Sequence, residues 1–188
     1  MADTAVSALG GAQYEGFATV TEAPPQGMIT LRGDPADAAL RETLRRETGL
    51  EVPAQRAILH GSDGRAIAWM APDELMLLVP HGEATALTDR LQSALEGHFA
   101  LAVEMSDARA LFAVEGPQAH AVLAKLCPVD FAELSPGEIR RTRCAQVAAA
   151  LWMEAPGHFR LLCFRSVAQY VFDLLARSAR PGGEVGRF

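Results

Sequence analysis

A repeated pattern most constrains the fold of this chain. The run Ile29–Pro35 contains β-forming residues followed by a glycine and a proline, and Phe112–Pro117 repeats this arrangement. Gly33 and Gly116 set an offset of 83 in the numbering. A β-rich run that ends at a glycine before a proline is typical of a strand that turns into a helix. Because a constant offset between such patterns indicates an internal repeat, we predict two similar halves.

The offset continues beyond this turn. The Trp-Met pairs at 69–70 and 152–153 hold the two tryptophans of the chain and are related by the same offset. After one inserted residue the offset becomes 84, and it relates Pro72 to Pro156, Leu77 to Leu161, Leu78 to Leu162, Leu87 to Val171 and Leu91 to Leu175. We therefore expect repeat units at residues 16–98 and 99–178, packed as one compact domain, with Trp69 and Trp152 in equivalent positions.

Local signals predict the same order of elements in each half. In the first half we expect strands at 17–21 and 28–32, a helix from Asp34 and Pro35 to Gly49, two strands around a turn at 61–64, a strand at 74–79 and a helix at 83–95. In the second half we expect strands at 101–105 and 110–115, a helix at 117–126, strands at 141–145, 147–153 and 159–164, and a helix at 167–176. Short successive strands favour antiparallel pairing, so the predicted class is α+β with two strand-strand-helix-strand-strand-strand-helix units. The ends, residues 1–15 and 180–188, are expected to be flexible.

Composition excludes several functions. The 188 residues are 49% hydrophobic and 21% charged, which is typical of a globular domain. The net charge of −6 argues against nucleic-acid binding, which needs a basic face. No stretch approaches the roughly 18 consecutive apolar residues of a membrane helix. Residues 1–11 lack the basic and apolar regions of a secretory signal, so a cytoplasmic location is expected.

The sequence also lacks the common motifs of metal and cofactor sites. Cys127, Cys144 and Cys163 are far apart and form no CxxC pair, and the five histidines form no HxxxH pair. This spacing predicts neither a disulfide framework nor a zinc site. There is no GxxxxGK[ST] or GxGxxG phosphate loop and no GxSxG nucleophile turn. We therefore expect this chain to bind no cofactor.

Some polar residues have two interpretations each. Arg140, Arg141 and Arg143 form the densest basic cluster, and strand spacing places Arg141 and Arg143 on one face and Arg140 on the other. They are either a solvated strand edge, where charge deters unwanted pairing, or an anion site or subunit contact. Glu104 is a candidate for acid–base chemistry. Ser166 precedes the last expected helix and is predicted to cap it.

Four runs resemble the gamma subunit of heterotetrameric sarcosine oxidase: Asp73–Pro80, Ser106–Ala110, Pro136–Glu138 and Cys163–Tyr170. The resemblance covers roughly residues 28–178. It implies the fold of the folate-binding domain of the glycine-cleavage T-protein, a duplication whose units exchange their first strands. It also implies a complex that oxidatively demethylates sarcosine to glycine. In that complex, the alpha, beta and delta subunits would carry FAD, FMN, NAD, zinc and tetrahydrofolate.

The chain departs from the T-protein motifs. Where that family has FDxSH, with a catalytic aspartate, this sequence has Glu104 in place of the aspartate and Asp107 in place of the histidine. The segment that matches GGxxxDD, residues 147–152, has neither glycine nor acid. We therefore expect a non-catalytic, structural subunit. The expected interface candidates are Arg140, Arg141, Arg143, Arg165 and Tyr170, although Arg165 is equally suited to pairing with a buried carboxylate. The alternative is a folate-binding, aminomethyltransferase-like enzyme that uses Glu104.

Overall fold

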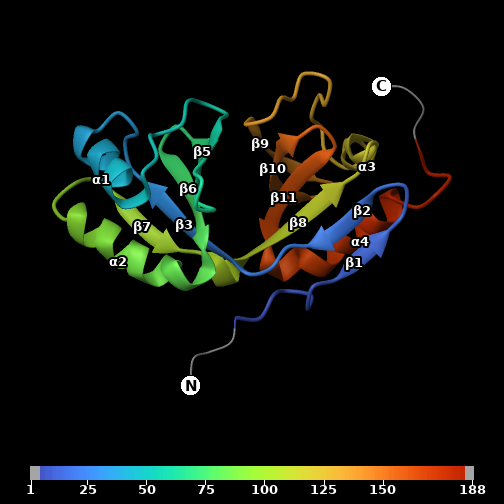
Figure 1. Cartoon of the computed structure of the whole chain (residues 1–188), viewed down its shortest axis with the longest axis horizontal. Coiled ribbons are helices and arrows are strands. Elements are labelled where there is room, and N and C mark those ends of the chain that lie inside the picture. Colours follow the sequence, from blue (N-terminus) through green and yellow to red (C-terminus); the bar gives the residue numbers. More distant parts are fainter. Residues whose placement is uncertain (1–4, 185–188) are drawn as a thin grey trace. The chain divides into compact units, whose positions relative to one another are not determined.

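The computed structural model describes residues 5–184, which form two compact units (Figure 1). The middle unit consists of Gln26–Ser106. The terminal unit combines the described residues up to Pro25 with those from Asp107 onward. Each unit contains one antiparallel sheet and its own helices. None of the helices in residues 5–184 is long and apolar enough to cross a membrane.

The middle unit is built on a five-stranded sheet. In spatial order its strands are β4 (Ile58–His60), β5 (Ala66–Ala71), β6 (Glu74–Pro80), β3 (Gln26–Arg32) and β7 (Leu101–Glu104). All neighbouring strands are antiparallel. Helix α1 (Ala38–Thr48) follows β3, and the 3-10 turn η1 (His81–Glu83) leads into α2 (Ala84–Ala94). The core forms where Ile29, Leu77 and other strand residues pack against Leu40, Leu44 and Leu87 of the helices.

The terminal unit is built on a six-stranded sheet. Its strands lie in the order β1 (Gln13–Glu15), β2 (Thr19–Glu22), β8 (Arg109–Glu115), β11 (His158–Phe164), β10 (Val147–Ala155) and β9 (Ile139–Cys144), all antiparallel. The 3-10 turn η2 (Ser106–Ala108) precedes β8, and α3 (Ala119–Ala124) follows it. The turn η3 (Arg165–Val167) leads into α4 (Ala168–Ser178). Phe112, Leu151 and Leu161 of the sheet pack against Leu123 and Val171 of the helices.

The predicted α+β class with mainly antiparallel sheets is confirmed. The compact units differ from the expected halves at 16–98 and 99–178 by an exchange of first strands, which the family resemblance implies. Strand β2 belongs to the terminal unit and β7 to the middle unit, so each half of the sequence contributes its first strand to the other unit. Hydrogen bonding across a sheet, rather than continuity of the chain, decides which strands share a core.

The start of α1 differs from the prediction, and its end does not. Asp37, not Asp34, caps the helix, because its Oδ1 accepts hydrogen bonds from the N–H groups of Ala39 (2.7 Å) and Leu40 (3.3 Å). Asp34 instead stabilises the turn that precedes the helix, where its Oδ1 accepts a hydrogen bond from the N–H of Ala36. Gly49 ends the helix as predicted, with φ 73°, a left-handed conformation that glycine adopts without steric cost.

The prediction that Ser166 caps the last helix is wrong. Ser166 lies inside η3, and α4 begins two residues later at Ala168. The residue at the N-cap position is Val167, and no side chain makes a capping hydrogen bond there. The 3-10 turn itself leads the chain into the helix, so the serine hydroxyl is not needed for that purpose.

The N-terminal segment is more ordered than the flexible end that we expected. Residues 13–15 form β1, which pairs with β2. Before β1, Glu22 holds the segment, because its carboxylate accepts hydrogen bonds from Ser7 Oγ (2.9 Å), Leu9 N (2.9 Å) and Gly11 N (2.7 Å). Glu22 is only 3% exposed, and a buried carboxylate requires such donors. Residues 1–4 and 185–188 of the expected flexible ends lie outside the described residues.

The two tryptophans do not occupy equivalent positions, so that prediction is wrong. Trp69 pairs with Leu75 and packs against the core of the middle unit. Trp152 lies between Leu151 and Met153, which both point into the core of the terminal unit. Because side chains alternate along a strand, Trp152 faces the opposite side of its sheet. A difference of one residue in register is enough to exchange the two faces.

Candidate functional site

Glu104, the candidate acid–base residue, is held in place at the end of β7. Its Oε1 accepts a hydrogen bond from Ser106 Oγ (3.0 Å), and its Oε2 accepts one from Thr85 Oγ1 (2.8 Å). Ser106 Oγ also accepts a hydrogen bond from the N–H of Met28 (3.1 Å). Glu104 thus ties the end of β7 to the first turn of α2 and, through Ser106, to β3. Both carboxylate oxygens are engaged within the middle unit.

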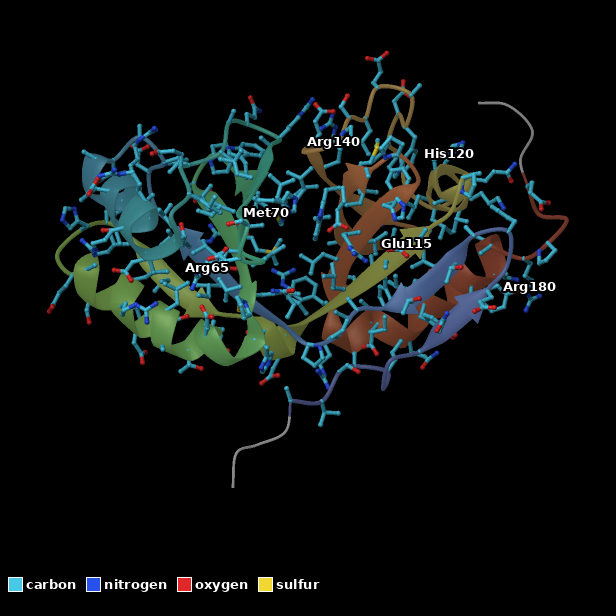
Figure 2. The ribbon with its side chains drawn as sticks, viewed as in Figure 1. Arg65, Met70, Glu115, His120, Arg140 and Arg180 are labelled. Carbon is cyan, nitrogen blue, oxygen red and sulfur yellow. The ribbon has the colours of Figure 1, made fainter. Side chains whose placement is uncertain are left out.

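The arginine cluster lies on β9, the outermost strand of the terminal unit's sheet. Figure 2 shows Arg140 at this strand. Its guanidinium donates to Glu138 Oε2 and to the Ile139 carbonyl, both at 3.2 Å. Arg143 donates to the carbonyl and the side-chain oxygen of Gln146, both at 3.2 Å. The alternation of β9 places Arg141 and Arg143 on the face opposite to Arg140, as predicted. The edge position matches the solvated-edge interpretation, and Arg141 and Arg143 are both exposed there.

Arg165 and Tyr170 lie in a second region of the terminal unit. The half-buried Arg165 donates a hydrogen bond from Nη2 to the backbone carbonyl of Ser7 (3.1 Å). This partner of Arg165 is therefore a carbonyl of the N-terminal segment, not a buried carboxylate. Tyr170 extends from α4 and is 42% exposed. The five predicted residues therefore come from two regions of the terminal unit: three lie on β9, and Arg165 and Tyr170 lie on η3 and α4.

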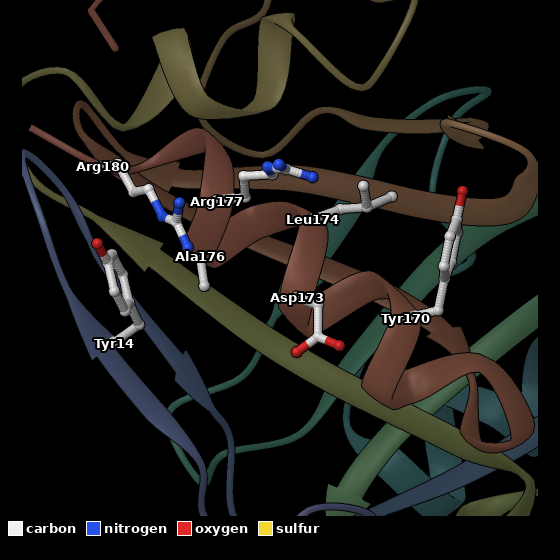
Figure 3. Close-up of a pocket in the computed structure, with 7 residues that line it drawn as sticks. All are labelled: Tyr14, Tyr170, Asp173, Leu174, Ala176, Arg177 and Arg180. Carbon is white, nitrogen blue, oxygen red and sulfur yellow. The ribbon is translucent and has the colours of Figure 1, made fainter. Parts of the chain in front are cut away.

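Tyr170 lines a groove between α4 and β1 (Figure 3). The groove has a volume of about 490 Å³ and is lined by Tyr14, Tyr170, Asp173, Leu174, Ala176, Arg177 and Arg180. Tyr14 and Arg180 lie at one end and Tyr170 at the other. Tyr14, Arg177 and Arg180 were not among the residues predicted from the sequence. The spacing of Tyr170, Asp173, Leu174 and Arg177 does predict a shared helix face, but nothing local pairs that face with Tyr14.

A row of apolar side chains is exposed on the middle unit. Phe99, Leu101 and Val103, here called the β7 ridge, are 100%, 55% and 37% exposed. They alternate with Ala100 and Ala102, which face the core, so the ridge lies on one face of an edge strand. Gln92 of α2 donates a hydrogen bond to the Ala102 carbonyl (2.8 Å) and thereby covers part of the free backbone edge. The ridge side chains themselves have no such cover.

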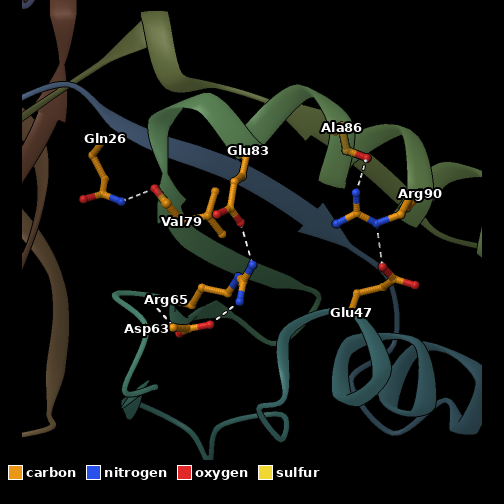
Figure 4. Close-up of polar contacts among 8 residues, drawn as sticks. All are labelled: Gln26, Glu47, Asp63, Arg65, Val79, Glu83, Ala86 and Arg90. Carbon is orange, nitrogen blue, oxygen red and sulfur yellow. Dashed lines mark hydrogen bonds and ion pairs between the residues drawn. The ribbon is translucent and has the colours of Figure 1, made fainter.

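Other polar clusters of the middle unit are structural links (Figure 4). Arg65 bonds to Asp63 in the same turn and to Glu83 Oε2 (2.5 Å) before α2. Arg90 of α2 donates to Glu47 Oε2 of α1 (2.7 Å). This hydrogen bond is the main cause that lowers the pKa of Glu47 below its usual value. These contacts connect neighbouring elements, so the charges of these side chains serve the fold.

All three cysteines, Cys127, Cys144 and Cys163, are buried. Burial raises the pKa of Cys163 to about 12. A hydrogen bond with Cys144, together with burial, raises the pKa of Cys127. Because the thiolate is the reactive form, we expect both thiols to be unreactive near neutral pH. Within residues 5–184, no three His, Cys, Asp or Glu side chains are grouped so as to hold a metal ion.

Comparison with known proteins gives a consistent result. The model of the sarcosine oxidase, gamma subunit family matches residues 32–179. The chain is 30% identical over 152 residues to sarcosine oxidase subunit gamma of Corynebacterium sp. strain U-96, covering 79% of this chain and 71% of that protein. It is 31% identical over 162 residues to the Arthrobacter sp. subunit gamma, covering 82% of this chain and 77% of that protein.

Solved structures agree. A chain of the heterotetrameric sarcosine oxidase from Corynebacterium sp. U-96 superposes with a TM-score of 0.81 at 25% identity, covering 94% of this chain and 91% of that chain. The aminomethyltransferase T of the Bartonella henselae glycine cleavage system has a TM-score of 0.64 at 18% identity, covering 85% of this chain and 45% of that chain, and shares the fold. The family match covers most of the sequence, and the chain belongs to the sarcosine oxidase gamma subunit family.

Proposed function

We propose that this chain is the non-catalytic, structural gamma subunit of a heterotetrameric sarcosine oxidase that oxidatively demethylates sarcosine to glycine. The observation that carries this proposal is the family match over residues 32–179. The superposition on a chain of the heterotetrameric enzyme supports it. The partners are the alpha, beta and delta subunits, which hold FAD, FMN, NAD, zinc and tetrahydrofolate. This chain holds no cofactor, and the complex acts in the cytoplasm.

We further propose that the chain arose by internal duplication. The strand ladders of the two units support this. Ile29 of β3 pairs with Leu77 of β6, and Phe112 of β8 pairs with Leu161 of β11. Phe112 follows Ile29 at the offset of 83, and Leu161 follows Leu77 at the offset of 84. Every pair of the β3–β6 ladder has a counterpart at these offsets in the β8–β11 ladder.

An irregularity is also repeated. In the middle unit the β5–β6 ladder shifts register between Trp69 and Ala71, and in the terminal unit the β10–β11 ladder shifts between Met153 and Ala155. Met153 and Ala155 follow Trp69 and Ala71 at the offset of 84. Bulges are features that related structures retain, so a bulge at the same offset favours duplication. These ladders make Met153, not Trp152, the counterpart of Trp69.

The setting of Glu104 supports a non-catalytic role. The carboxylate of Glu104 accepts hydrogen bonds from Ser106 and Thr85, and these bonds link the end of β7 to β3 and α2, which is a structural task. We therefore assign Glu104 to the stability of the middle unit. This argues against the alternative of an aminomethyltransferase-like enzyme that uses this residue.

Exposed apolar side chains support a role in assembly. Permanent hetero-complexes bury about 2,000 Å² or more, and their interfaces are enriched in aromatic and arginine side chains. The β7 ridge offers Phe99 and Leu101, and α4 offers Tyr170. On β9, the exposed face with Arg141 and Arg143 is a further contact candidate. We propose that these surfaces are covered in the complex.

Co-expression tests the proposal directly. The chain is produced with the alpha, beta and delta subunits, and the complex is isolated by size exclusion. We expect stoichiometric co-elution, a flavin absorption spectrum in the complex, and neither flavin nor sarcosine oxidation in the isolated chain. A wild-type chain that never co-elutes with these partners contradicts the proposal. Titration of the isolated chain with tetrahydrofolate then tests the enzyme alternative.

A further inference from the structure

The groove between α4 and β1 combines aromatic side chains with arginines. Tyr14 and Tyr170 lie at its two ends, and Arg177 and Arg180 lie along α4 and just beyond it (Figure 3). Leu174 adds an apolar surface between them. Tyrosine and arginine are the residue types that most often dominate binding energy at protein interfaces. The groove therefore has the composition of an anchoring site.

The groove between α4 and β1 carries more positive than negative charge. Within residues 5–184, neither Arg177 nor Arg180 makes a side-chain hydrogen bond or ion pair, and both side chains are exposed. The single carboxylate of the groove, on Asp173, accepts a hydrogen bond from Gln169 Nε2 (2.8 Å). Two guanidinium groups thus face solvent beside one engaged acid. This local excess of positive charge occurs on a chain whose net charge is −6.

The backbone under the groove is fixed. The N–H of Phe17 donates to the Ala179 carbonyl at the end of α4 (2.9 Å), and Gly16 lies directly against the same carbonyl group. Lys125 of the α3 region donates to the Ser178 carbonyl (2.7 Å). The Phe17 bond holds the β1–β2 turn against the end of α4, and the Lys125 bond holds the same end of α4 to the α3 region, so the backbone that carries Tyr14 and Arg180 is in place before any partner arrives. Such preorganisation lowers the entropy that binding costs.

We infer that the α4–β1 groove receives an acidic segment of a partner subunit. The inference rests on the proposed function as a subunit of the oxidase complex. Asp or Glu side chains of that segment form two-point hydrogen bonds with Arg177 and Arg180, a geometry that suits the planar guanidinium group. An apolar side chain of the same segment packs on Leu174 between the two tyrosine rings. Because the groove is basic, an acidic segment fits it better than a purely apolar segment.

The test measures assembly of the chain with the alpha, beta and delta subunits. The variants R177E and R180E are compared with R41E, which makes the same charge change at the exposed Arg41 on α1. We expect the Kd of assembly to rise roughly 30-fold or more for each groove variant and to change less than about twofold for R41E. R177K and R180K, which keep the charge, stay within about tenfold of wild type. Assembly of the wild type weakens as salt concentration rises.

The remaining outcomes separate the possibilities. If the wild type assembles and both R177E and R180E assemble equally well, the groove proposal is overturned while the subunit function stands. If Leu174→Ala weakens assembly and the two charge reversals do not, the groove binds an apolar element and the proposal is again overturned.

Micromolar binding of succinate or inorganic phosphate to the isolated chain, with assembly unaffected by the charge reversals, assigns the groove to a small anion instead. A wild-type chain that does not assemble overturns both the groove proposal and the proposed function. Thermal unfolding of each isolated variant shows whether it is folded.

Discussion

A Cβ atom on Gly16 would lie only 1.9 Å from the carbonyl oxygen of Ala179. This close approach joins the turn between β1 and β2 to the end of α4. The contact is backbone to backbone, so neither side can yield by rotating a side chain. The N-terminal strand therefore depends on a position where only glycine fits.

Gly16→Ala tests this contact. We expect the free energy of unfolding to fall by about 2–4 kcal/mol, because the backbone must move to admit the methyl group. The matched control is Gly82→Ala in η1, where an added Cβ meets nothing within 4 Å. Gly82→Ala is expected to be neutral or slightly stabilising. Urea unfolding of both variants provides the comparison, and equal stabilities would contradict the role of the contact.

Substitution of Glu104 separates structure from catalysis. We expect Glu104→Ala to destabilise the isolated chain by about 1–3 kcal/mol, because the buried hydroxyl of Ser106 loses its acceptor. Glu104→Gln keeps one carbonyl acceptor and has a smaller effect. Sarcosine oxidation by the assembled complex stays within about twofold of wild type for Glu104→Gln, because kcat depends on groups that touch the substrate.

The control for this experiment is Glu96→Ala, which removes an exposed carboxylate in the same unit. A loss of kcat of tenfold or more in Glu104→Gln, with unchanged thermal stability and assembly, would assign a catalytic role to Glu104.

The ion pair between α1 and α2 predicts a pH dependence. The hydrogen bond from Arg90 lowers the pKa of Glu47 in the folded chain. A lowered folded-state pKa contributes stability that is complete above the unfolded-state pKa and is lost as pH falls through the folded-state value. Glu47→Gln should therefore be less stable than wild type at pH 7, and the difference should shrink below the usual glutamate pKa. Urea unfolding across the acid range measures this. The exposed Glu51→Gln serves as control, and a pH-independent difference for Glu47→Gln would contradict the linkage.

The β7 ridge predicts an assembly defect without a folding defect. Phe99 is fully exposed, so Phe99→Ser should leave the thermal stability of the isolated chain unchanged within about 0.5 kcal/mol. If the ridge is covered in the complex, the same change should weaken assembly about tenfold or more. The control is Val6→Ser, which alters another exposed apolar side chain. Equal assembly of Phe99→Ser and wild type would remove the ridge from the interface.

Local sequence signals predicted most of the elements. Gly49 ends α1 because its left-handed conformation is a property of a single residue. The alternation along β9 also places Arg140 apart from Arg141 and Arg143, as strand geometry requires. Signals that depend on a choice between near neighbours were less reliable. Asp34 and Asp37 are both suited to capping, and only the path of the backbone decides for Asp37.

The candidate site was harder to predict, because distant residues form it. Tyr14 reaches the groove through the pairing of β1 with β2 and the contact of Gly16 with Ala179. Neither contact has a local sequence signature. Glu22 orders residues 7–11 in the same way, by attracting donors from a segment that composition alone marks as mobile.

The exchange of first strands also sets an order of events during synthesis. Every strand of the middle unit comes from the continuous stretch Gln26–Ser106, so this unit has all its parts as soon as that stretch has left the ribosome. Strand β2 must wait, because Val20 pairs with Val114, which is made only after the whole middle unit. Pairing over such a distance is slow and leaves strand edges open to wrong partners. The first two strands to be made, β1 and β2, are therefore among the last to join their complete sheet.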